Sequence, residues 1–411
     1  MRATIGALTI VASVGCAGDE GLIVRTVSEY GGTSIAGVEV QVGDQRWVTT
    51  GSSGEARFAA TAAPYTVLIH QPMRFTDSHG VAHQNDKIWR LIGQTANPLV
   101  AEVDGSLAQI YKSSVSGTVT GRSGEPDTVV RIGGVLAAAD GTFSDSQGIW
   151  WEGGPTYPFD LRALETDAAS PPGRYLRFAS RRVTATDTTG FLGSGGSLTG
   201  VTLQLAPVSE ARVSGQVFAA DAFAQAELHS SVALRFGRYD LYGVGAGTVS
   251  GRPAQFDYPV PRVDGSQPWI TFSATAVAGG TRHPAFAGHA RGVAAPASGL
   301  SFDLPGAPSL LEPLEGAAIG PSTVFRWTPV LPGGKYLLDM ECDEWKDGAV
   351  TRGIHYRGVE SAGTEASLPA IPGVSIPPGT ACRWSTIWVA AGDPAVENRY
   401  SSSADRSAVI Q

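Results

Sequence analysis

The stretch from Ser34 to Val42 reads SIAGVEVQV, and its last five residues alternate between valine and a polar side chain. Because successive side chains of a β-strand point to opposite faces, the three valines share one face, whereas Glu39 and Gln41 share the other. This is the pattern of a strand that buries one side against a core and exposes the other to water. The stretch therefore predicts a half-buried strand of an antiparallel sheet.

The same two-residue period recurs along the chain, whereas helical periodicity is nearly absent. The best helical candidate, Asp221 to His229, is short. Runs of β-branched and aromatic residues are separated by glycine, proline and Asp-Gly pairs, and Asp-Gly favours the positive φ of hairpin turns. The pattern predicts an all-β fold, a tandem array of about four antiparallel β-sandwiches, each with its own core. The Asp-Gly pairs are Asp104-Gly105, Asp140-Gly141, Asp264-Gly265 and Asp347-Gly348.

The segment from Gly32 to Ile69 contains three motifs in order: G-x-x-I-x-G-x-x-V, T-T-x-x-x-G-x-x-x-F and Y-T-V. It resembles the carboxypeptidase regulatory-like domain, a transthyretin-type sandwich. The resemblance implies this fold for residues 16–112. It implies no peptidase site, because such domains accompany enzymes, receptors and surface proteins alike.

Two patterns recur about one domain length apart. The motif V-S-G-x-V at Val115–Val119 returns 98 residues later at Val213–Val217. The alternating strand Val201–Leu205 returns 99 residues later as Leu300–Leu304. Matching offsets at both ends predict two copies of one sandwich, residues 113–207 and 208–305. A repeat of this length indicates a tandem array rather than a solenoid.

The last unit, residues 306–411, has a tryptophan in its second expected strand (Trp327) and a tyrosine at the start of its third (Tyr336). The motif P-G-T-x-x-x-W, from Pro378 to Trp384, leads into the sixth. These features resemble a fibronectin type III domain. The resemblance implies a C-terminal sandwich of that kind.

Cys382 stands two residues before Trp384, where the fibronectin type III family has an aromatic residue. Cys342 lies on the expected buried face of the third strand, in phase with Tyr336. The end of the third strand and the start of the sixth are antiparallel neighbours in that fold, so the resemblance implies that the sulfurs of Cys342 and Cys382 can form a disulfide. The bridge would close a 40-residue loop and stabilise the fold by about 3–4 kcal/mol. The alternative is a pair of unpaired buried thiols.

The composition excludes several classes of protein. The 411 residues include 42% hydrophobic and 17% charged side chains, with a net charge of −8. This excludes a disordered acidic chain and a multi-pass membrane protein. Glycine (52) and proline (26) are frequent but too few for collagen. No run of lysine and arginine is present, so we expect no nucleic-acid partner.

The N-terminus predicts export. One cation, Arg2, precedes an apolar run from Ala3 to Val14 and a junction of small residues, as in a secretory signal peptide. The run is too short to cross about 30 Å of hydrocarbon as a helix. We therefore expect residues 1–15 to be a signal peptide.

The junction Ser13-Val14-Gly15-Cys16 resembles a bacterial lipobox, although leucine is usual at the position of Ser13. The resemblance implies lipidation of Cys16, with the lipid anchoring the protein to a membrane of the cell envelope, the outer membrane in the first instance. Ordinary cleavage and secretion is the alternative.

The chain has none of the common catalytic motifs: no H-E-x-x-H, G-x-S-x-G, P-loop, G-x-G-x-x-G or C-x-x-C. We therefore expect a non-enzymatic protein with no cofactor and no metal. One histidine-rich stretch could hold a metal ion, or act in a metal-dependent hydrolase, but a solvated loop is the simpler interpretation. It contains His70, Asp77, His79, His83 and Asp86.

Two other polar groups have simpler interpretations as well. Asp339, Glu341 and Asp343 alternate along one strand and are interpreted as its solvated face, because calcium needs six to eight oxygens from several segments. His283 and His289 flank a proline and are interpreted as loop residues.

Trp150 and Trp151 cannot both point inward if they share one strand. At least one is then exposed and can stack on a sugar ring or anchor a protein partner. Trp150 and Trp151 are therefore the ligand-contact candidates, and Trp345 and Trp388 are similar ones, although packing or a place at the rim is the simpler interpretation. The sequence indicates a surface binding or spacer module with an unidentified protein or glycan partner. The alternative is a carbohydrate-binding or enzyme-accessory protein that uses exposed tryptophans.

Overall fold

The computed structural model confirms an all-β fold. Within the described residues the only helical element is a single 3₁₀ turn, Asp221–Phe223, so the expected helix at 221–229 is confined to its first turn and a strand begins at Leu228. The structure describes residues 21–29, 32–76, 80–105, 111–151, 154–167, 173–189, 195–237, 240–276, 284–346, 349–361, 363–392 and 396–411.

The first sandwich pairs a three-stranded sheet, order β4-β1-β7, with a four-stranded sheet, order β3-β2-β5-β6. Val38, Val40 and Val42 are fully buried, as the alternation of the opening stretch predicts. The strands are β1 (Leu22–Ser28), β2 (Glu39–Val42), β3 (Val48–Thr49), β4 (Glu55–Phe58), β5 (Tyr65–Thr76), β6 (Ala82–Gln94) and β7 (Leu99–Val103).

The second sandwich contains the sheets β11-β8-β14 and β10-β9-β12-β13-β15. Its strands are β8 (Tyr111–Thr120), β9 (Thr128–Ile132), β10 (Val135–Leu136), β11 (Thr142–Trp151), β12 (Thr156–Asp167), β13 (Tyr175–Thr186), β14 (Gly196–Gln204) and β15 (Ala206–Pro207). The third contains β19-β16-β22 and β18-β17-β20-β21. Its strands are β16 (Ser209–Ala219), β17 (Leu228–Arg235), β18 (Leu241–Val249), β19 (Ala254–Arg262), β20 (Gln267–Thr275), β21 (Phe286–Gly292) and β22 (Ala297–Leu304).

These three sandwiches share one topology. In each, the first strand pairs antiparallel with the fourth and parallel with the seventh. The second strand pairs with the third and the fifth, and the fifth pairs with the sixth. The first sandwich therefore has the same topology as the two segments that contain the sequence repeat.

The fourth sandwich has a different strand order. Its small sheet is β23-β25-β28, and β26 lies between β27 and β29 in the facing sheet. Trp327, Trp384 and Trp388 fill its core. The strands are β23 (Leu310–Glu312), β24 (Ala317–Ile319), β25 (Val324–Trp327), β26 (Lys335–Lys346), β27 (Ala349–Ser361), β28 (Glu365–Ser367), β29 (Ala381–Val389), β30 (Glu397–Ser402) and β31 (Arg406–Ile410).

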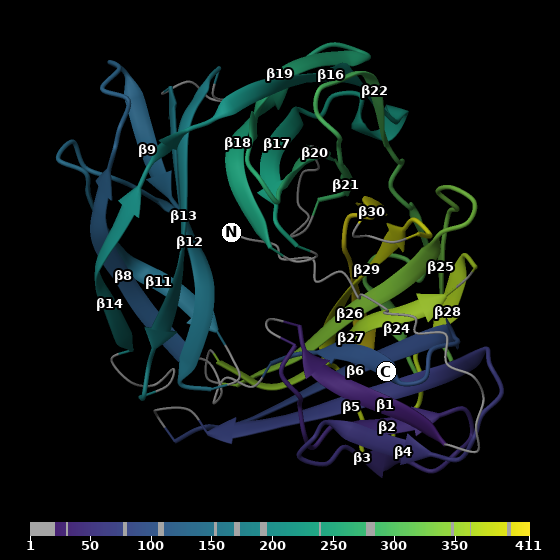
Figure 1. Ribbon diagram of the computed structural model, residues 1–411. Helices are drawn as coiled ribbons and strands as arrows, with labels where there is room; N and C mark the ends of the chain where they lie inside the picture. Colours follow the sequence, from purple (N-terminus) through teal and green to yellow (C-terminus); the bar gives the residue numbers. More distant parts are fainter. Residues whose placement is uncertain are drawn as a thin grey trace.

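The large sheets of the first, third and fourth sandwiches join edge to edge into one 14-stranded sheet. β6 pairs in parallel with β27, and β21 pairs antiparallel with β30. Each pairing covers two edge strands whose backbone groups would otherwise face water. The hydrophobic clusters also cross the junctions: Ile88 of β6 belongs to the cluster of the fourth sandwich, and Phe178 of β13 to that of the third. Side-chain periodicity does not predict the shared hydrogen-bonded sheet. Figure 1 shows the resulting arc, with the third sandwich at the top, the fourth at the right and the first at the bottom.

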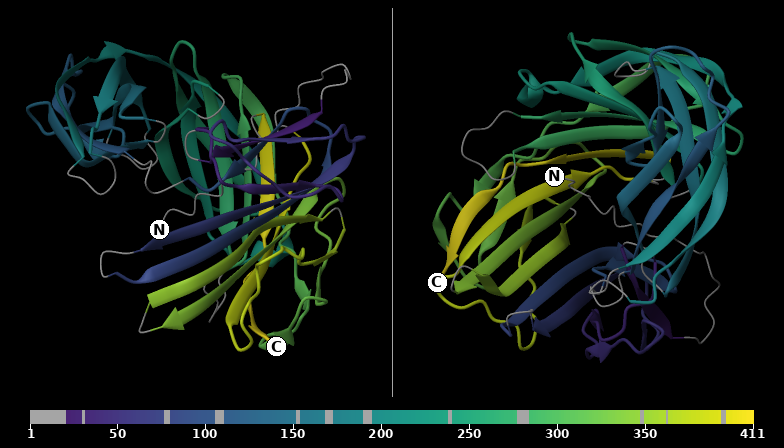
Figure 2. Two further views of the ribbon diagram at one scale, coloured as in Figure 1. Left: turned by 90° about the horizontal axis from the view of Figure 1, so that it is seen from below. Right: turned by 90° about the vertical axis from the view of Figure 1, so that its left-hand side faces the viewer.

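The second sandwich lies beside the third and stays outside the shared sheet, because its edge strand β13 pairs with its own β15. Side chains hold it in place instead. Both terminal nitrogens of Arg162 lie 2.6 Å from the carboxylate of Asp240. The Arg162 guanidinium also lies 3.9 Å from the ring centre of Phe236, which stacks on Phe178. The left view of Figure 2 shows this sandwich at one end of the molecule, next to the third.

Candidate functional site

The two ligand-contact candidates lie at the end of β11 and face opposite ways. Trp150 is 48% exposed, whereas Trp151 is 5% exposed. The Trp151 indole N–H donates to the Gly154 carbonyl at 2.8 Å, which fixes the ring in the sandwich. Of these two candidates, Trp150 is therefore the one that offers a ring face to a ligand. Trp388 is buried at 1%, so the expectation of an exposed ring there is wrong; the Trp345 side chain lies outside the described residues.

Trp151 belongs to a row of aromatic rings at one end of the second sandwich. The Tyr111 and Tyr157 rings lie 5.8 and 6.0 Å from it, centre to centre, in nearly parallel planes. Tyr157, which is 41% exposed, continues the row to Phe159 at 6.1 Å. On the opposite face of β11 the Lys112 ammonium lies 4.9 Å from the centre of the Trp150 ring. Aromatic faces beside a cation suit a sugar ring or an apolar protein side chain.

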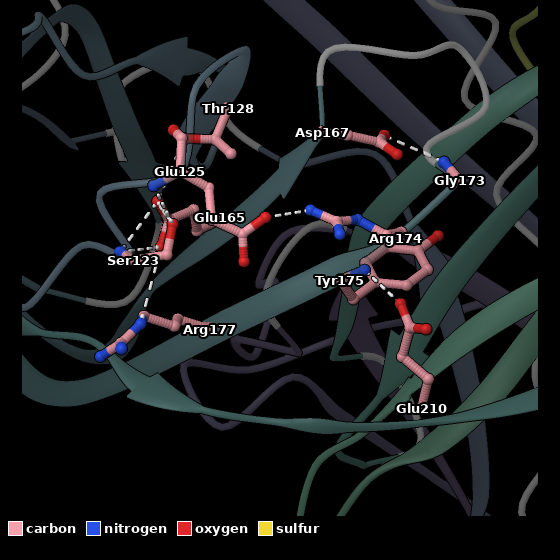
Figure 3. A network of polar contacts seen from close by, with 10 residues as sticks. All are labelled: Ser123, Glu125, Thr128, Glu165, Asp167, Gly173, Arg174, Tyr175, Arg177 and Glu210. Carbon is pink, nitrogen blue, oxygen red and sulfur yellow. Dashed lines mark hydrogen bonds and ion pairs between the residues drawn. The ribbon is translucent and has the colours of Figure 1, made fainter.

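A buried carboxylate stiffens the same sandwich near its β8–β9 loop. Glu165 is fully buried and accepts hydrogen bonds from the backbone N–H and hydroxyl of Ser123 and from the hydroxyl of Thr128. Figure 3 shows this cluster beside the Arg174–Glu125 ion pair and Arg177. Because the Glu165 oxygens already have several donors, we interpret the network as an anchor for the loop.

The sequence suggested that the histidine-rich stretch is a solvated loop, and this interpretation is wrong. Its described residues belong to β5 and β6, which form a long hairpin because β6 finds a second partner in β27. His70 is buried, with Nδ1 2.7 Å from Glu39 and Nε2 3.0 Å from Asp86. His83 stacks on Phe75 instead, so the two histidines do not converge. Asp77 and His79 lie outside the described residues.

The Glu39–His70–Asp86 cluster has shifted protonation equilibria. Burial disfavours the charged form of His70, but its hydrogen bonds to Asp86 and Glu39 outweigh burial and raise the pKa of His70. Burial also opposes ionisation of Asp86, yet hydrogen bonds from His70, Gln84 and Arg74 lower the pKa of Asp86 to about 2. The cluster is therefore a hydrogen-bonded network of one histidine and two carboxylates, in which His70 and Asp86 are buried and Glu39 is partly exposed.

Charged groups of the first and fourth sandwiches meet at Asp104, just after β7. Lys87 of β6 and Arg357 of β27 both pair with the Asp104 carboxylate, Arg357 at 2.9 Å. Gln71 donates to the Asp104 carbonyl at 2.7 Å. Burial, together with repulsion from Arg357, lowers the pKa of Lys87 to about 8. Asp104 thus ties the two sandwiches together.

His289 lies in β21, so its interpretation as a loop residue is wrong. Its Nε2 lies 2.7 Å from Glu397 of β30, and its Nδ1 accepts the backbone N–H of Asp303 at 2.8 Å. Burial lowers the pKa of His289. The residue bridges the third and fourth sandwiches. His283 lies outside the described residues.

The predicted cysteine pair comes together in the fourth sandwich. Cys342 of β26 lies directly opposite Cys382 of β29, and their sulfurs are at disulfide-bonding distance in the core. Cys16 lies outside the described residues.

Two open grooves lie on the described surface, and the first borders the His70 cluster because Arg74 belongs to both. One, of about 490 Å³, is lined by Arg74, Phe75, His83 and Arg352 where the β5–β6 hairpin meets β27. The other, of about 860 Å³, lies on the outer face of β19-β16-β22 beside Phe218.

The sequence did not reveal that a histidine lies beside the acidic face of β26. Glu341 and Asp343 are partly exposed on β26, and His355 of β27 lies beside both carboxylates. The Asp347-Gly348 pair could have indicated a hairpin. It could not have indicated on which face of the hairpin the His355 side chain lies.

No known family model matches the chain, and no curated protein matches it. In the part of the chain that the structure describes, no helix is long and apolar enough to cross a bilayer.

Proposed function

We propose that this protein is an exported, non-enzymatic lipoprotein of the cell envelope that binds a protein or glycan partner through a rigid set of sandwiches. The lipobox-like junction at Cys16 supports the anchor. Only five residues separate Cys16 from Leu22, where β1 begins. Fully extended, they reach about 18 Å. A lipid on Cys16 would therefore hold the first sandwich close to the membrane surface.

The pairing of β6 with β27 favours a binding module over a spacer. A spacer projects its last domain away from its anchor, so its sandwiches follow one another in a line. Here the fourth sandwich instead returns to the first through a parallel strand pair, with Arg352 opposite Gln84 and Tyr356 opposite Ile88. This closed arrangement supports a fixed binding surface near the membrane (Figure 1).

Palmitate labelling and membrane fractionation test the anchor. The full chain should incorporate labelled palmitate and sediment with membranes, and Cys16→Ala should remove both properties. Cys342→Ala, which leaves the junction intact, should still be labelled. If Cys16→Ala keeps its label and its location, the lipoprotein proposal is wrong, and release of the unmodified chain into the medium would support plain secretion.

A carbohydrate-binding role is a second candidate, favoured by the exposed Trp150 ring beside Lys112. A glycan array with the purified chain should show binding that Trp150→Ala reduces by at least about tenfold, since stacking on an aromatic ring contributes roughly 1.5 kcal/mol. Phe218→Ala removes a comparably exposed ring, 42% exposed, from the third sandwich and is the matched control. Equal binding by Trp150→Ala and Phe218→Ala would contradict the role.

A further inference from the structure

Three side chains with metal-binding atoms converge on the half-buried face of the β26–β27 hairpin. His355 Nε2 lies 3.4 Å from a carboxylate oxygen of Asp343 and 3.7 Å from one of Glu341. One ligand atom from each residue lies within 4.8 Å of the other two. Two ligands about 2.1 Å from one tetrahedral ion lie about 3.4 Å apart, so this spacing fits a shared ion.

A fourth donor comes from the first sandwich. Asn85 of β6 lies directly opposite Gly353 in the parallel pair with β27. The Asn85 side-chain carbonyl oxygen is buried and has no hydrogen-bond partner among the described residues. A buried carbonyl oxygen without a donor is costly and indicates a missing partner. An electropositive ligand would satisfy it.

Gly353 leaves the space in which these atoms meet. A Cβ built on Gly353 would lie 3.1 Å from Asn85 Oδ1, 3.1 Å from His355 Nε2 and 3.3 Å from Asp343 Oδ1. Three donors of different residues therefore surround one small volume that any other residue would partly fill. This convergence is independent of the spacing of Glu341 and Asp343 along their strand.

The neighbouring cations are directed elsewhere. Lys87, opposite His355 in the parallel pair, and Arg357, two residues further along β27, both pair with Asp104. The two carboxylates therefore give the cluster a local negative charge that a divalent cation would neutralise.

We propose that Asn85, Glu341, Asp343 and His355 form a binding site for a divalent transition metal, zinc in the first instance, at the junction of the first and fourth sandwiches. An imidazole with carboxylate and amide oxygens is a mixed nitrogen and oxygen set that suits zinc. Calcium would require six to eight oxygens. Because Asn85 belongs to the first sandwich and the other ligands to the fourth, the ion would clamp the two together.

Zinc titration of the chelator-treated full chain, followed by calorimetry, tests the proposal. We expect one ion per chain and a higher unfolding temperature with zinc. His355→Ala should weaken binding by at least about 100-fold, since even outer-shell changes cost about 10–100-fold. His229→Ala is the matched control, because His229 is half-exposed and has a carboxylate 4.0 Å away. Equal zinc affinity of His355→Ala and His229→Ala would overturn the proposal, as would binding of calcium but not zinc.

Two further variants separate metal binding from a structural role. Asn85→Asp adds a charged ligand and should tighten zinc binding by about tenfold. Gly353→Ala keeps every ligand but fills the space between them, so it should weaken binding while the circular dichroism spectrum of the metal-free chain stays that of the parent. If Asn85→Asp leaves zinc affinity unchanged and Gly353→Ala binds zinc as the parent does, no ion lies between these donors.

Discussion

Gly117 and Gly215, which lie 98 residues apart in the chain, occupy the same position in the second and third sandwiches. A Cβ on Gly117 would lie well inside 3.0 Å of the Val201 carbonyl oxygen, and one on Gly215 would meet Leu300 in the same way. Both glycines lie where the first strand pairs in parallel with the seventh and the register shifts by a bulge. The repeated V-S-G-x-V motif therefore marks a close approach of two backbones.

We expect Gly117→Ala and Gly215→Ala each to lower the free energy of unfolding by about 3 kcal/mol, because the added methyl group must push two strands apart. Gly243→Ala is the control: Gly243 also lies in a strand, β18, but has no atom within 4 Å of the position of its Cβ. It should change stability by less than about 0.5 kcal/mol. Urea unfolding of the three variants measures the difference, and equal values would contradict the backbone interpretation.

The same glycines explain which copies the sequence could reveal. The second and third sandwiches share the bulge, with Gly200 and Gly299 at φ +69° and +66° in their seventh strands. In the first sandwich β1 and β7 pair without a register shift. That copy needs no glycine at this position, so its sequence lacks the repeated motif although its topology is the same.

The shared sheet and the His355 cluster were beyond sequence reasoning for two physical reasons. The pairing of β6 with β27 is made by backbone groups, which leave no trace in side-chain periodicity. The position of His355 depends on one bulge: β26 and β27 pair with a register shift between Glu344 and Trp345. Without this shift His355 would lie opposite Met340, on the core face, rather than opposite Glu341.

The cysteine pair was within reach because alternation places both cysteines on buried strand faces, and the resemblance to a fibronectin type III domain implies that these two strands are neighbours. We expect Cys342→Ala with Cys382→Ala to lower the free energy of unfolding by about 3–4 kcal/mol, since the bridge closes a 40-residue loop. Thermal unfolding with and without a reductant measures this. The reductant should destabilise the parent chain and leave the double variant unchanged. A parent chain that does not respond to the reductant, once labelling has shown its thiols to be free, would show that the bridge contributes little.

Asp104 should be the most sensitive charge at the junction of the first and fourth sandwiches. Asp104→Asn leaves Lys87 and Arg357 facing each other with only the more distant Glu29 carboxylate, 3.9 Å from Arg357, and breaking a buried pair in this way costs about 3–5 kcal/mol. Asp257→Asn breaks the exposed pair with Arg212 and should cost less than about 1 kcal/mol.

The double variant Asp104→Asn with Lys87→Met should recover part of the loss, since it removes one of the two repelling cations. Chemical denaturation of the single and double variants gives the coupling between these two residues. Strictly additive losses would show that Lys87 and Asp104 do not interact.

The hydrogen-bonded network around His70 should make stability depend on pH with a definite sign. Hydrogen bonds to Asp86 and Glu39 raise the pKa of His70 in the folded chain, despite burial, above the usual value of about 6.5. The folded state therefore binds this proton more tightly than the unfolded state does. The stabilisation is fully present below about pH 6.5 and is lost as the pH rises through the folded pKa. Asp86, with a pKa of about 2, stays ionised throughout this window.

We expect His70→Gln to cost about 3 kcal/mol at about pH 5.5, since it removes one partner of a buried ion pair, and less at about pH 9, because this stabilisation is lost as the pH rises through the raised pKa of His70. Denaturant unfolding of parent and variant at both pH values measures the two costs. His229→Gln, at a half-exposed histidine, should cost less than about 0.5 kcal/mol at either. A His70→Gln cost that is larger at the higher pH would mean that His70 is neutral in the folded protein and that burial, rather than Asp86 and Glu39, controls its charge.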